Sequence, residues 1–359
     1  MKTVSIIKHE NYKEKELLPK VKNILQSSGI LNSIHNKKVL LKPNCTGIFS
    51  SNQAKTTNPI FFRCIIKLLI PITKELVVGE SSSVNIDTID AYKKTGIFDE
   101  CKKLNIKMID FKKSKYKKIK INGKILNSIE LPEEVFIFDI VISIAKLKTN
   151  YVSTISCSIK NLKGLLKDKD KKRFHEIGLS KAVYDLSNSI NNVYGIIDGI
   201  IGNELYEPKR ANIILASKDI FSLDYISARI MRISPKKIEH LKLINKNKIK
   251  IIGERVKDIK ISFKKDMPGL KFLEREFKVT IINNKSCSNC IGALYLSLKK
   301  TKKIDPNLLN NLKLNIGKNN ENNFEIINFG NCSYKSKKIN IPGCPPRTSE
   351  FIKNIRRIK

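Results

Sequence analysis

Several residue types and patterns are scarce in this chain of 359 residues, and each shortage excludes a class of protein. The chain has no tryptophan, and aromatic residues make up only 7% of it. No run reaches the roughly 20 apolar residues of a membrane-spanning helix, because the longest candidate, residues 61–78, contains four charged residues and a proline. The N-terminal segment turns charged after seven residues and lacks the apolar core of a signal peptide. We therefore expect a cytoplasmic protein without a membrane partner.

Familiar catalytic motifs are also missing from the sequence. There is no P-loop, no G-x-G-x-x-G, no H-E-x-x-H and no G-x-S-x-G. The chain therefore carries no signature of the common nucleotide-binding proteins, zinc peptidases or hydrolases.

Acidic residues are few, 33 against 69 lysines and arginines, which gives a formal net charge of +36. Clustered basic residues can bind nucleic acid, because they release counterions from its phosphates. Here the excess is mostly lysine, spread over the whole length among many isoleucines and asparagines, as A/T-rich coding would produce whatever the function. We favour this coding bias and expect no specific nucleic-acid partner. A functional basic surface is the alternative.

Short apolar runs of strand type alternate with helical patterns through the first 260 residues or so. This alternation predicts an α/β domain with a mostly parallel sheet and helices on both faces, which we place at residues 1–275. Two lysine-rich runs, 112–120 and 167–173, are typical of solvated loops or hairpin edges. The expected strands are Val4–Ile7, Val39–Leu41, Leu76–Val78, Lys107–Ile109, Ile137–Ile144, Val193–Ile197 and Asn212–Ala216. The expected helices are Tyr12–Gln26, Pro59–Leu69, Thr88–Leu104, Leu179–Ile190 and Phe221–Met231.

The remaining residues, 276–359, have a different pattern and predict a small cysteine-bearing βα unit. A strand at 279–282 leads into a cysteine pair, which a helix at 291–300 follows. A second strand is expected at 324–327, and a closing helix at 349–358.

The eight cysteines are unevenly distributed along the chain. Four lie singly in the first 160 residues, whereas the last 73 residues contain the spacing C-x2-C-x41-C-x11-C. A C-x2-C pair between a strand and a helix can present two thiolates to one metal, and the helix N-terminus lowers their pKa. Four thiolates suit either a tetrahedral zinc ion or a 4Fe-4S cluster. The ligand set so predicted is Cys287, Cys290, Cys332 and Cys344.

The two later cysteines sit in short glycine-containing motifs, a G-x-C at 330–332 and the sequence Ile341-Pro342-Gly343-Cys344-Pro345-Pro346. Together with the earlier C-x2-C, these motifs resemble the proximal-cluster motif of nickel–iron hydrogenase small subunits. The resemblance covers about the last 75 residues and implies a 4Fe-4S cluster held by the four cysteines. The intervening gap is shorter than in hydrogenases, and structural zinc or no metal at all stay as alternatives.

Short polar motifs follow one another in the first part of the chain. They are Lys42-Pro43-Asn44, Thr57-Asn58-Pro59, Gly79-Glu80-Ser81-Ser82, Tyr92-x-x-Thr95-Gly96, Lys146-Leu147-Lys148-Thr149, Lys160-Asn161-x-x-Gly164, His175, Asp198-Gly199 and Asp219 with Leu223-Asp224. In this order they resemble the family catalogued as domain of unknown function 362. The resemblance implies its fold and a redox role with a C-terminal iron–sulfur segment, but no substrate. The family commonly has histidine after the Lys-Thr pair, where this chain has Asn150.

These motifs fall where predicted strands end, the edge at which parallel sheets place ligand crevices. The lysines there could bind a carboxylate or phosphate, the amides could orient it, and the carboxylates could act as general bases. The histidine could shuttle a proton near neutral pH. Surface lysines, a strand-ending turn and an exposed histidine are the plainer explanations. The candidate catalytic residues are Lys42, Asn44, Glu80, Lys146, Lys148, Lys160, Asn161, His175 and Asp198, and all of them except His175 are expected to share one cleft.

Two functional hypotheses follow from these patterns. The first is an iron–sulfur protein, either a redox enzyme or an electron-transfer protein, with a small anionic substrate and a redox partner. The second is a non-catalytic binding protein with a structural zinc and a basic surface. The visible absorption of a cluster would separate them.

Overall fold

The chain forms two compact units, one made of Met1–Thr149 with Ser153–Lys265 and the other of Asn150–Val152 with Asp266–Lys359. The computed structural model describes residues 2–242, 249–259, 261, 263, 270–318, 326–333 and 339–358. Helix α12 (Leu270–Phe277) belongs to the second unit, so the units divide before this helix, whereas the sequence placed the boundary at residue 275. None of the described helices combines the length and apolar content needed to span a bilayer.

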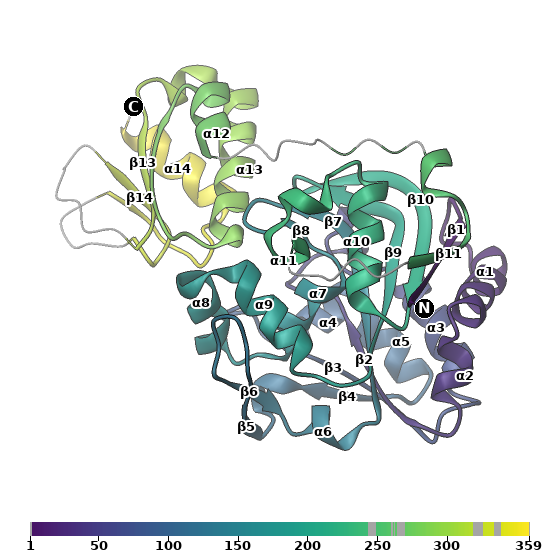
Figure 1. Cartoon of the computed structure of the whole chain (residues 1–359). Coiled ribbons are helices and arrows are strands. Elements are labelled where there is room, and N and C mark those ends of the chain that lie inside the picture. The colour runs from purple at the N-terminus through teal and green to yellow at the C-terminus, as the bar shows by residue number, and fades with distance from the viewer. Residues whose placement is uncertain are drawn as a thin grey trace. The chain divides into compact units, whose positions relative to one another are not determined.

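The first unit is built on a mostly parallel sheet, which confirms the expected fold class (Figure 1). Its nine described strands lie in the order β11-β1-β10-β9-β7-β2-β3-β4, with β8 paired to β7. Along this order β10 runs antiparallel to both neighbours, and the other adjacent pairs are parallel. The strands are β1 (Lys2–Lys8), β2 (Lys38–Pro43), β3 (Glu75–Glu80), β4 (Lys107–Asp110), β7 (Ile140–Asn150), β8 (Thr154–Ile155), β9 (Val193–Glu204), β10 (Glu207–Ser217) and β11 (Ile249–Gly253).

Helices cover both faces of this sheet, because successive strand residues point to opposite sides. In β2, Val39 and Leu41 join one buried apolar cluster, whereas Leu40 joins the other. The first face carries α1 (Glu14–Ser27), α2 (Ile30–Ile34), α3 (Pro59–Leu69), α4 (Thr88–Thr95) and α5 (Ile97–Lys103). The second carries α7 (Ser158–Asn161), α8 (Asp168–Ile177), α9 (Leu179–Asn188), α10 (Ile220–Ile230) and α11 (Glu239–Lys242).

Local chemistry explains where several of these elements begin and end. Helix α3 starts as predicted, because the side chain of Asn58 accepts hydrogen bonds from Ile60 N and Phe61 N. The helix expected at 88–104 is instead divided into α4 and α5 by Gly96, whose φ of 82° is left-handed. Strand β7 begins at Ile140 because a short helix, α6 (Glu134–Ile137), precedes it.

One lysine-rich run has the structure expected for it, and the other does not. Residues 112–120 end in β5 (Tyr116–Lys120), which pairs with β6 (Ser128–Pro132) as a hairpin. The loop expected at 167–173 is wrong, because these residues begin helix α8. The ammonium of Lys171 is buried there and donates to Ser81 Oγ at 2.5 Å and to the carbonyl of Ser82 at 2.6 Å. These distant partners satisfy a charge that the sequence pattern assigned to solvent.

The second unit contains a parallel sheet with strand order β12-β13-β14-β15 in its described part. The strands are β12 (Thr280–Asn284), β13 (Lys313–Gly317), β14 (Ile327–Phe329) and β15 (Asn340–Ile341). Helices α12, α13 (Ser288–Ile304) and α14 (Thr348–Ile358) supply its separate apolar core, with Leu294, Leu298 and Phe351 fully buried. Residues 324 and 325 of the strand expected at 324–327 lie outside the described residues.

Three asparagines, Asn315, Asn328 and Asn340, form a ladder across the small sheet. They stand opposite one another on β13, β14 and β15. Asn315 Nδ2 donates to Asn328 Oδ1 at 2.8 Å, and Asn328 Nδ2 donates to Asn340 Oδ1 at 3.1 Å. Asn315 and Asn328 are buried and Asn340 is half-buried, and a shift by one residue would turn these amides to the other face, so the Asn ladder specifies the register of the three strands.

Candidate functional site

The carboxyl edge of the main sheet gathers charged side chains from adjacent parallel strands. Lys42 lies near the end of β2, Glu80 ends β3, Lys146 lies in β7 and Asp198 lies in β9. Their exposed fractions are 0%, 3%, 1% and 0%, so each charge is buried and depends on a partner within the protein.

The first ion pair joins Lys42 and Glu80 through a short contact. Lys42 Nζ also donates to Asn161 Oδ1 at 3.3 Å and to the carbonyl of Pro43 at 3.1 Å. Burial raises the pKa of Glu80, and the nearby Lys42 opposes this shift. Gly164 lies directly against the pair, since a Cβ there would meet Glu80 Oε1 at 1.9 Å and Lys42 Nζ at 2.6 Å. The motif glycine is therefore needed for close approach of the backbone.

The second ion pair joins Lys146 and Asp198, with Nζ and Oδ2 2.7 Å apart. Tyr12, at the entrance to α1, completes it, because its hydroxyl donates to Asp198 Oδ1 at 2.8 Å and accepts from Lys146 Nζ at 3.0 Å. Burial lowers the pKa of Lys146, against the attraction of Asp198. Nothing in the sequence pattern marked Tyr12, which lies 186 positions from Asp198.

Lys148 differs from the two paired lysines. Its Nζ donates to Asn44 Oδ1 at 2.7 Å and to the carbonyl of Lys55 at 3.0 Å. In the described part of the chain, no Asp or Glu forms a salt bridge with it. Burial lowers the pKa of Lys148 to about 7, and the positive charges of Lys146, Lys42 and Lys55 act in the same direction.

Amide side chains connect Lys148 to the first ion pair. Asn44 Nδ2 donates to Asn161 Oδ1 at 3.0 Å, so the other end of the Asn44 amide faces Lys148. Asn161 Nδ2 in turn donates to Ser143 Oγ at 3.0 Å and to the carbonyl of Lys42 at 3.2 Å. We call the connected residues Lys42, Asn44, Glu80, Lys148 and Asn161 the lysine network.

Lys160 and His175 lie in a different group from the lysine network. His175 Nε2 is 2.7 Å from Lys163 Nζ. Burial, then Lys163 and Lys160, lower the pKa of His175 to about 2, which keeps the ring neutral and speaks against the expected proton shuttle. Lys160 also helps lower the pKa of the buried His240 to about 4. The sequence did not single out His240.

Two further polar residues of the motifs have structural partners. Asp224 accepts from Ser158 N at 2.8 Å and from Ile159 N at 2.9 Å, so it caps the short helix that carries Asn161. Burial raises the pKa of this carboxyl to about 7. Asn150, where histidine was expected, accepts a hydrogen bond from Val152 N at 3.0 Å.

The four C-terminal cysteines lie at the carboxyl edge of the small sheet. Cys287 and Cys290 follow β12, Cys332 follows β14, and Cys344 follows β15. These strands are parallel, so the cysteines leave the same edge. Phe329 on β14 pairs with Ile341 on β15. Cys332 comes three residues after Phe329, and Cys344 comes three residues after Ile341.

Hydrogen bonds tie the two later cysteine loops together. Gly330 N donates to the carbonyl of Ile341 at 3.0 Å, and Asn331 N donates to the carbonyl of Gly343 at 3.0 Å. Gly343 N donates back to Asn331 Oδ1 at 2.7 Å. Gly330 and Gly343 have φ values of 103° and 134°, a conformation that favours glycine.

The four thiols are also close enough to affect one another. The pKa of Cys290 is raised, first by a hydrogen bond with Cys287, then by burial, and then by the neighbouring Cys287, Cys344 and Cys332. Several thiolates held this close would repel one another unless a cation lay among them, so the chemistry of the donor set, four sulfurs, is that of a thiolate-bound cluster. Cys287 occupies the N-cap position of the 17-residue helix α13, whose dipole favours a thiolate there. Among the described residues, no group of three or more His, Cys, Asp or Glu has the spacing for a single metal ion.

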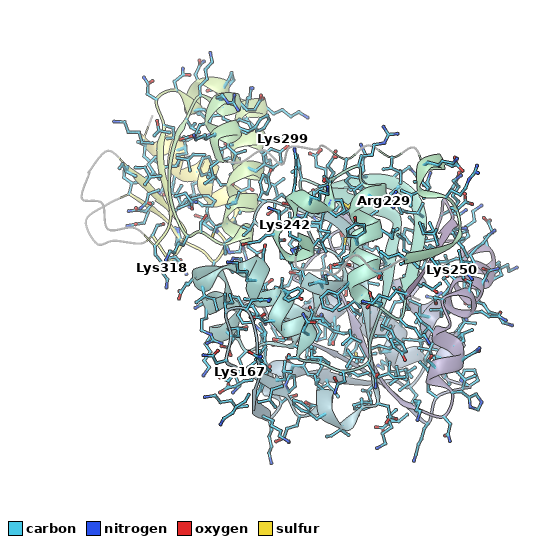
Figure 2. The ribbon with its side chains drawn as sticks, in the orientation of Figure 1. Lys167, Arg229, Lys242, Lys250, Lys299 and Lys318 are labelled. Carbon is cyan, nitrogen blue, oxygen red and sulfur yellow. The ribbon has the colours of Figure 1, made fainter. Side chains whose placement is uncertain are left out.

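Basic side chains cover both units (Figure 2). Those labelled in Figure 2 come from elements spread along the chain rather than from one helix or strand. They are Lys167, Arg229, Lys242, Lys250, Lys299 and Lys318.

Comparison with known proteins gives a family and one relative. The model of the family described as Domain of unknown function (DUF362) matches residues 39–229, which include the lysine network and both ion pairs. The chain is also 24% identical over 248 residues to the thylakoid-associated protein sll1697 of Synechocystis sp.. That similarity covers 66% of this chain and 76% of the relative.

Proposed function

This chain belongs to the DUF362 family, and we propose that it is an iron–sulfur protein that acts on a small anionic substrate. In this proposal Cys287, Cys290, Cys332 and Cys344 hold a 4Fe-4S cluster, and the lysine network with the Lys146–Asp198 pair forms the substrate site. The observation that carries the proposal is the convergence of the four cysteines on one edge of the small parallel sheet.

The cluster assignment is supported by the chemistry of the donor set and by resemblance. Four cysteines at one edge suit an iron–sulfur cube, which sulfur ligands surround from several sides. The order C-x2-C, G-x-C and I-P-G-C-P-P is similar to the proximal-cluster motif of nickel–iron hydrogenase small subunits. When bound, the cluster would supply one-electron redox chemistry.

The anionic substrate is supported by a charge imbalance at the main sheet. Lys42 and Lys146 are neutralised by Glu80 and Asp198. Lys55 and Lys148 have no carboxylate partner within the described residues, and since the pKa of Lys148 is lowered to about 7, the Lys55 ammonium is the charge left for a ligand. Carboxylate and phosphate groups are the ligands that such ammonium groups favour.

The test is anaerobic purification followed by a visible spectrum and analysis of iron, acid-labile sulfide and zinc. The proposal expects broad absorption in the visible region, with iron and sulfide in equal amounts. A colourless protein with stoichiometric zinc would contradict the iron–sulfur proposal and favour the alternative, a zinc-stabilised binding protein. If the protein binds neither iron nor zinc after anaerobic reconstitution, the four cysteines are not a metal site.

A cytoplasmic location and a soluble redox partner are further parts of the proposal. The name of the cyanobacterial relative places that protein at the thylakoid, which offers a contrasting location. Fractionation of cells that express a tagged copy would separate the two, because a membrane-bound protein would sediment with the membranes.

A further inference from the structure

We propose that Lys148 forms an imine with the carbonyl group of a small carboxylic acid, such as a 2-oxo acid. This inference deepens the proposed function and rests on it, since it names the substrate class of the same site. The geometry around the Lys148 amine carries it.

The hydrogen bonds of Lys148 suit a neutral amine. Such an amine has two N–H donors and one lone pair. The two hydrogens have acceptors at Asn44 Oδ1, 2.7 Å away, and at the carbonyl of Lys55, 3.0 Å away. The lone pair is then free to attack an electrophile. Imine-forming lysines need this unprotonated state.

The surroundings of Lys148 also favour the neutral amine. Lys42, Lys146 and Lys55 all repel a positive charge at this position, and in the described part of the chain no carboxylate pairs with it. The remaining titratable neighbour, Cys157, is buried, and its pKa is raised well above the ordinary value. That thiol therefore stays uncharged and does not stabilise an ammonium.

Two of the other three motif lysines, Lys42 and Lys146, provide a contrast at the same sheet edge. Lys42 and Lys146 each form an ion pair with a buried carboxylate, so their ammonium groups already have partners within the protein. Both are also completely or almost completely buried, whereas Lys148 is partly exposed. Of these three lysines, Lys148 is the one that combines partial exposure with an amine that no carboxylate pairs with in the described part of the chain.

Asn44 is the positioning residue for this amine. Its Nδ2 is held by Asn161 Oδ1, which itself accepts from Lys42, so the amide oxygen faces Lys148. The family motif residues Lys42, Asn44 and Asn161 therefore reach the reacting nitrogen through one chain of hydrogen bonds.

The chemical step is balanced without any further reagent. The Lys148 lone pair attacks the carbonyl carbon, and one amine proton passes to the carbonyl oxygen to give a neutral carbinolamine. The C–O bond then breaks as the hydroxyl leaves with the second amine proton as water, which forms the C=N bond of the imine, so no electrons are gained or lost. The carboxylate of the same substrate would be attracted by the Lys55 ammonium, which belongs to the loop that also bonds Lys148.

The experiment uses the full-length protein, glyoxylate as the probe, and cyanoborohydride to reduce any imine to a stable carboxymethyl-lysine. Modified peptides are then mapped by mass spectrometry after brief treatment at pH 7. We expect labelling of Lys148 to exceed that of the exposed Lys250 on β11 by about tenfold or more, because an ordinary lysine is almost fully protonated at this pH. Lys148→Arg should lose the label, and Lys250→Arg should keep it at Lys148.

Glycolate separates this inference from the proposed function, because it has the carboxylate but no carbonyl. Labelling of Lys148 no greater than that of Lys250 overturns the imine. If glycolate still raises the melting temperature of the wild type and of Lys148→Arg, the anion site survives that result. Selective labelling that glycolate does not slow supports the imine and counts against the carboxylate site. Mapping on the wild type gives a result even if the variant fails to fold.

Discussion

The carboxyl edges of the two sheets hold two kinds of polar site, which differ in how their charges are balanced. At the main sheet, buried lysines meet buried carboxylates and amides of the same unit, so the protein satisfies most of the charge itself. At the small sheet, four thiols are neighbours, and the groups that raise the pKa of Cys290 include the other three.

This difference indicates which site depends on an added component. Lysine and glutamate neutralise each other, so the main-sheet site can form when the chain folds alone. Thiols can stay protonated, but thiolates held together repel one another, so the proposed cluster would be the component that lets the cysteine site carry negative charge. The lysine network therefore resembles a prepared binding site, whereas the cysteines resemble a ligand set.

The largest effect is expected from the cysteines. Cys287→Ala or Cys344→Ala should reduce the iron and sulfide content of anaerobically purified protein nearly to zero, because three thiolates leave one iron of the cube without a protein ligand. Cys101→Ala is the control, since this buried cysteine lies in α5 of the other unit. Wild-type iron content in both ligand variants would show that the four cysteines do not act together.

The next largest effect should come from the buried ion pair. Glu80→Gln leaves the Lys42 charge uncompensated and should lower the free energy of unfolding by about 3–5 kcal/mol, measured by urea denaturation. Glu75→Gln, on the same strand, removes a partly exposed pair with Lys38 and should cost less than about 1 kcal/mol.

The double variant Lys42→Met, Glu80→Gln sharpens this comparison. It removes both charges and should recover part of the loss, because no unpaired charge is left buried. Equal losses in Glu80→Gln and Glu75→Gln would mean that the main-sheet pair is no more important than a surface pair.

A pH-dependent effect of intermediate size is expected from Lys148. Its pKa of about 7 in the folded protein lies below the ordinary value of 10.5, so the unfolded chain binds more protons between these values. Its contribution to stability should therefore rise with pH in this window, by at most about 1.4 kcal/mol per pH unit. Below pH 7 the cost of burying the charged ammonium is fully present.

Lys148→Met provides the reference for this measurement, because it lacks the titrating group and keeps a similar length. Urea denaturation of the wild type and the variant at several pH values gives the difference due to Lys148. A difference that stays constant from pH 7 to pH 10 would place the folded pKa of Lys148 near its ordinary value.

The smallest effect is expected for nucleic-acid binding. Binding to DNA or RNA, followed by fluorescence anisotropy, should be independent of sequence and should weaken at least about tenfold between low and physiological salt. Tight, sequence-selective binding at physiological salt would instead favour a functional basic surface.

Much of the fold could be predicted from the sequence, because apolar periodicity and helix caps act locally. Helix α3 was predicted with its bounds, since Asn58 and Pro59 mark its start. The strands that carry Lys42, Glu80 and Asp198 were also predicted, although several of their ends were not. The parallel arrangement then explains why these distant residues gather at one edge.

The rest of the site depends on tertiary contacts that no local pattern contains. Lys171 was assigned to a solvated loop, although Ser81 and Ser82 bind its ammonium. Tyr12 completes an ion pair with residues far away in the sequence. The sequence grouped His175 with the network lysines, whereas the structure places it beside Lys163. The order of residues along the sequence does not determine which face of a sheet a helix will cover.

The Asn ladder bears on how the second unit could receive the proposed cluster. Amide side chains align β13, β14 and β15 without any help from a metal, and the loops carrying Cys332 and Cys344 begin at paired positions. The ladder would thus hold two of the four thiols at matching positions on neighbouring strands. Insertion of the proposed cluster would then be a local step and would not have to drive the folding of the whole unit.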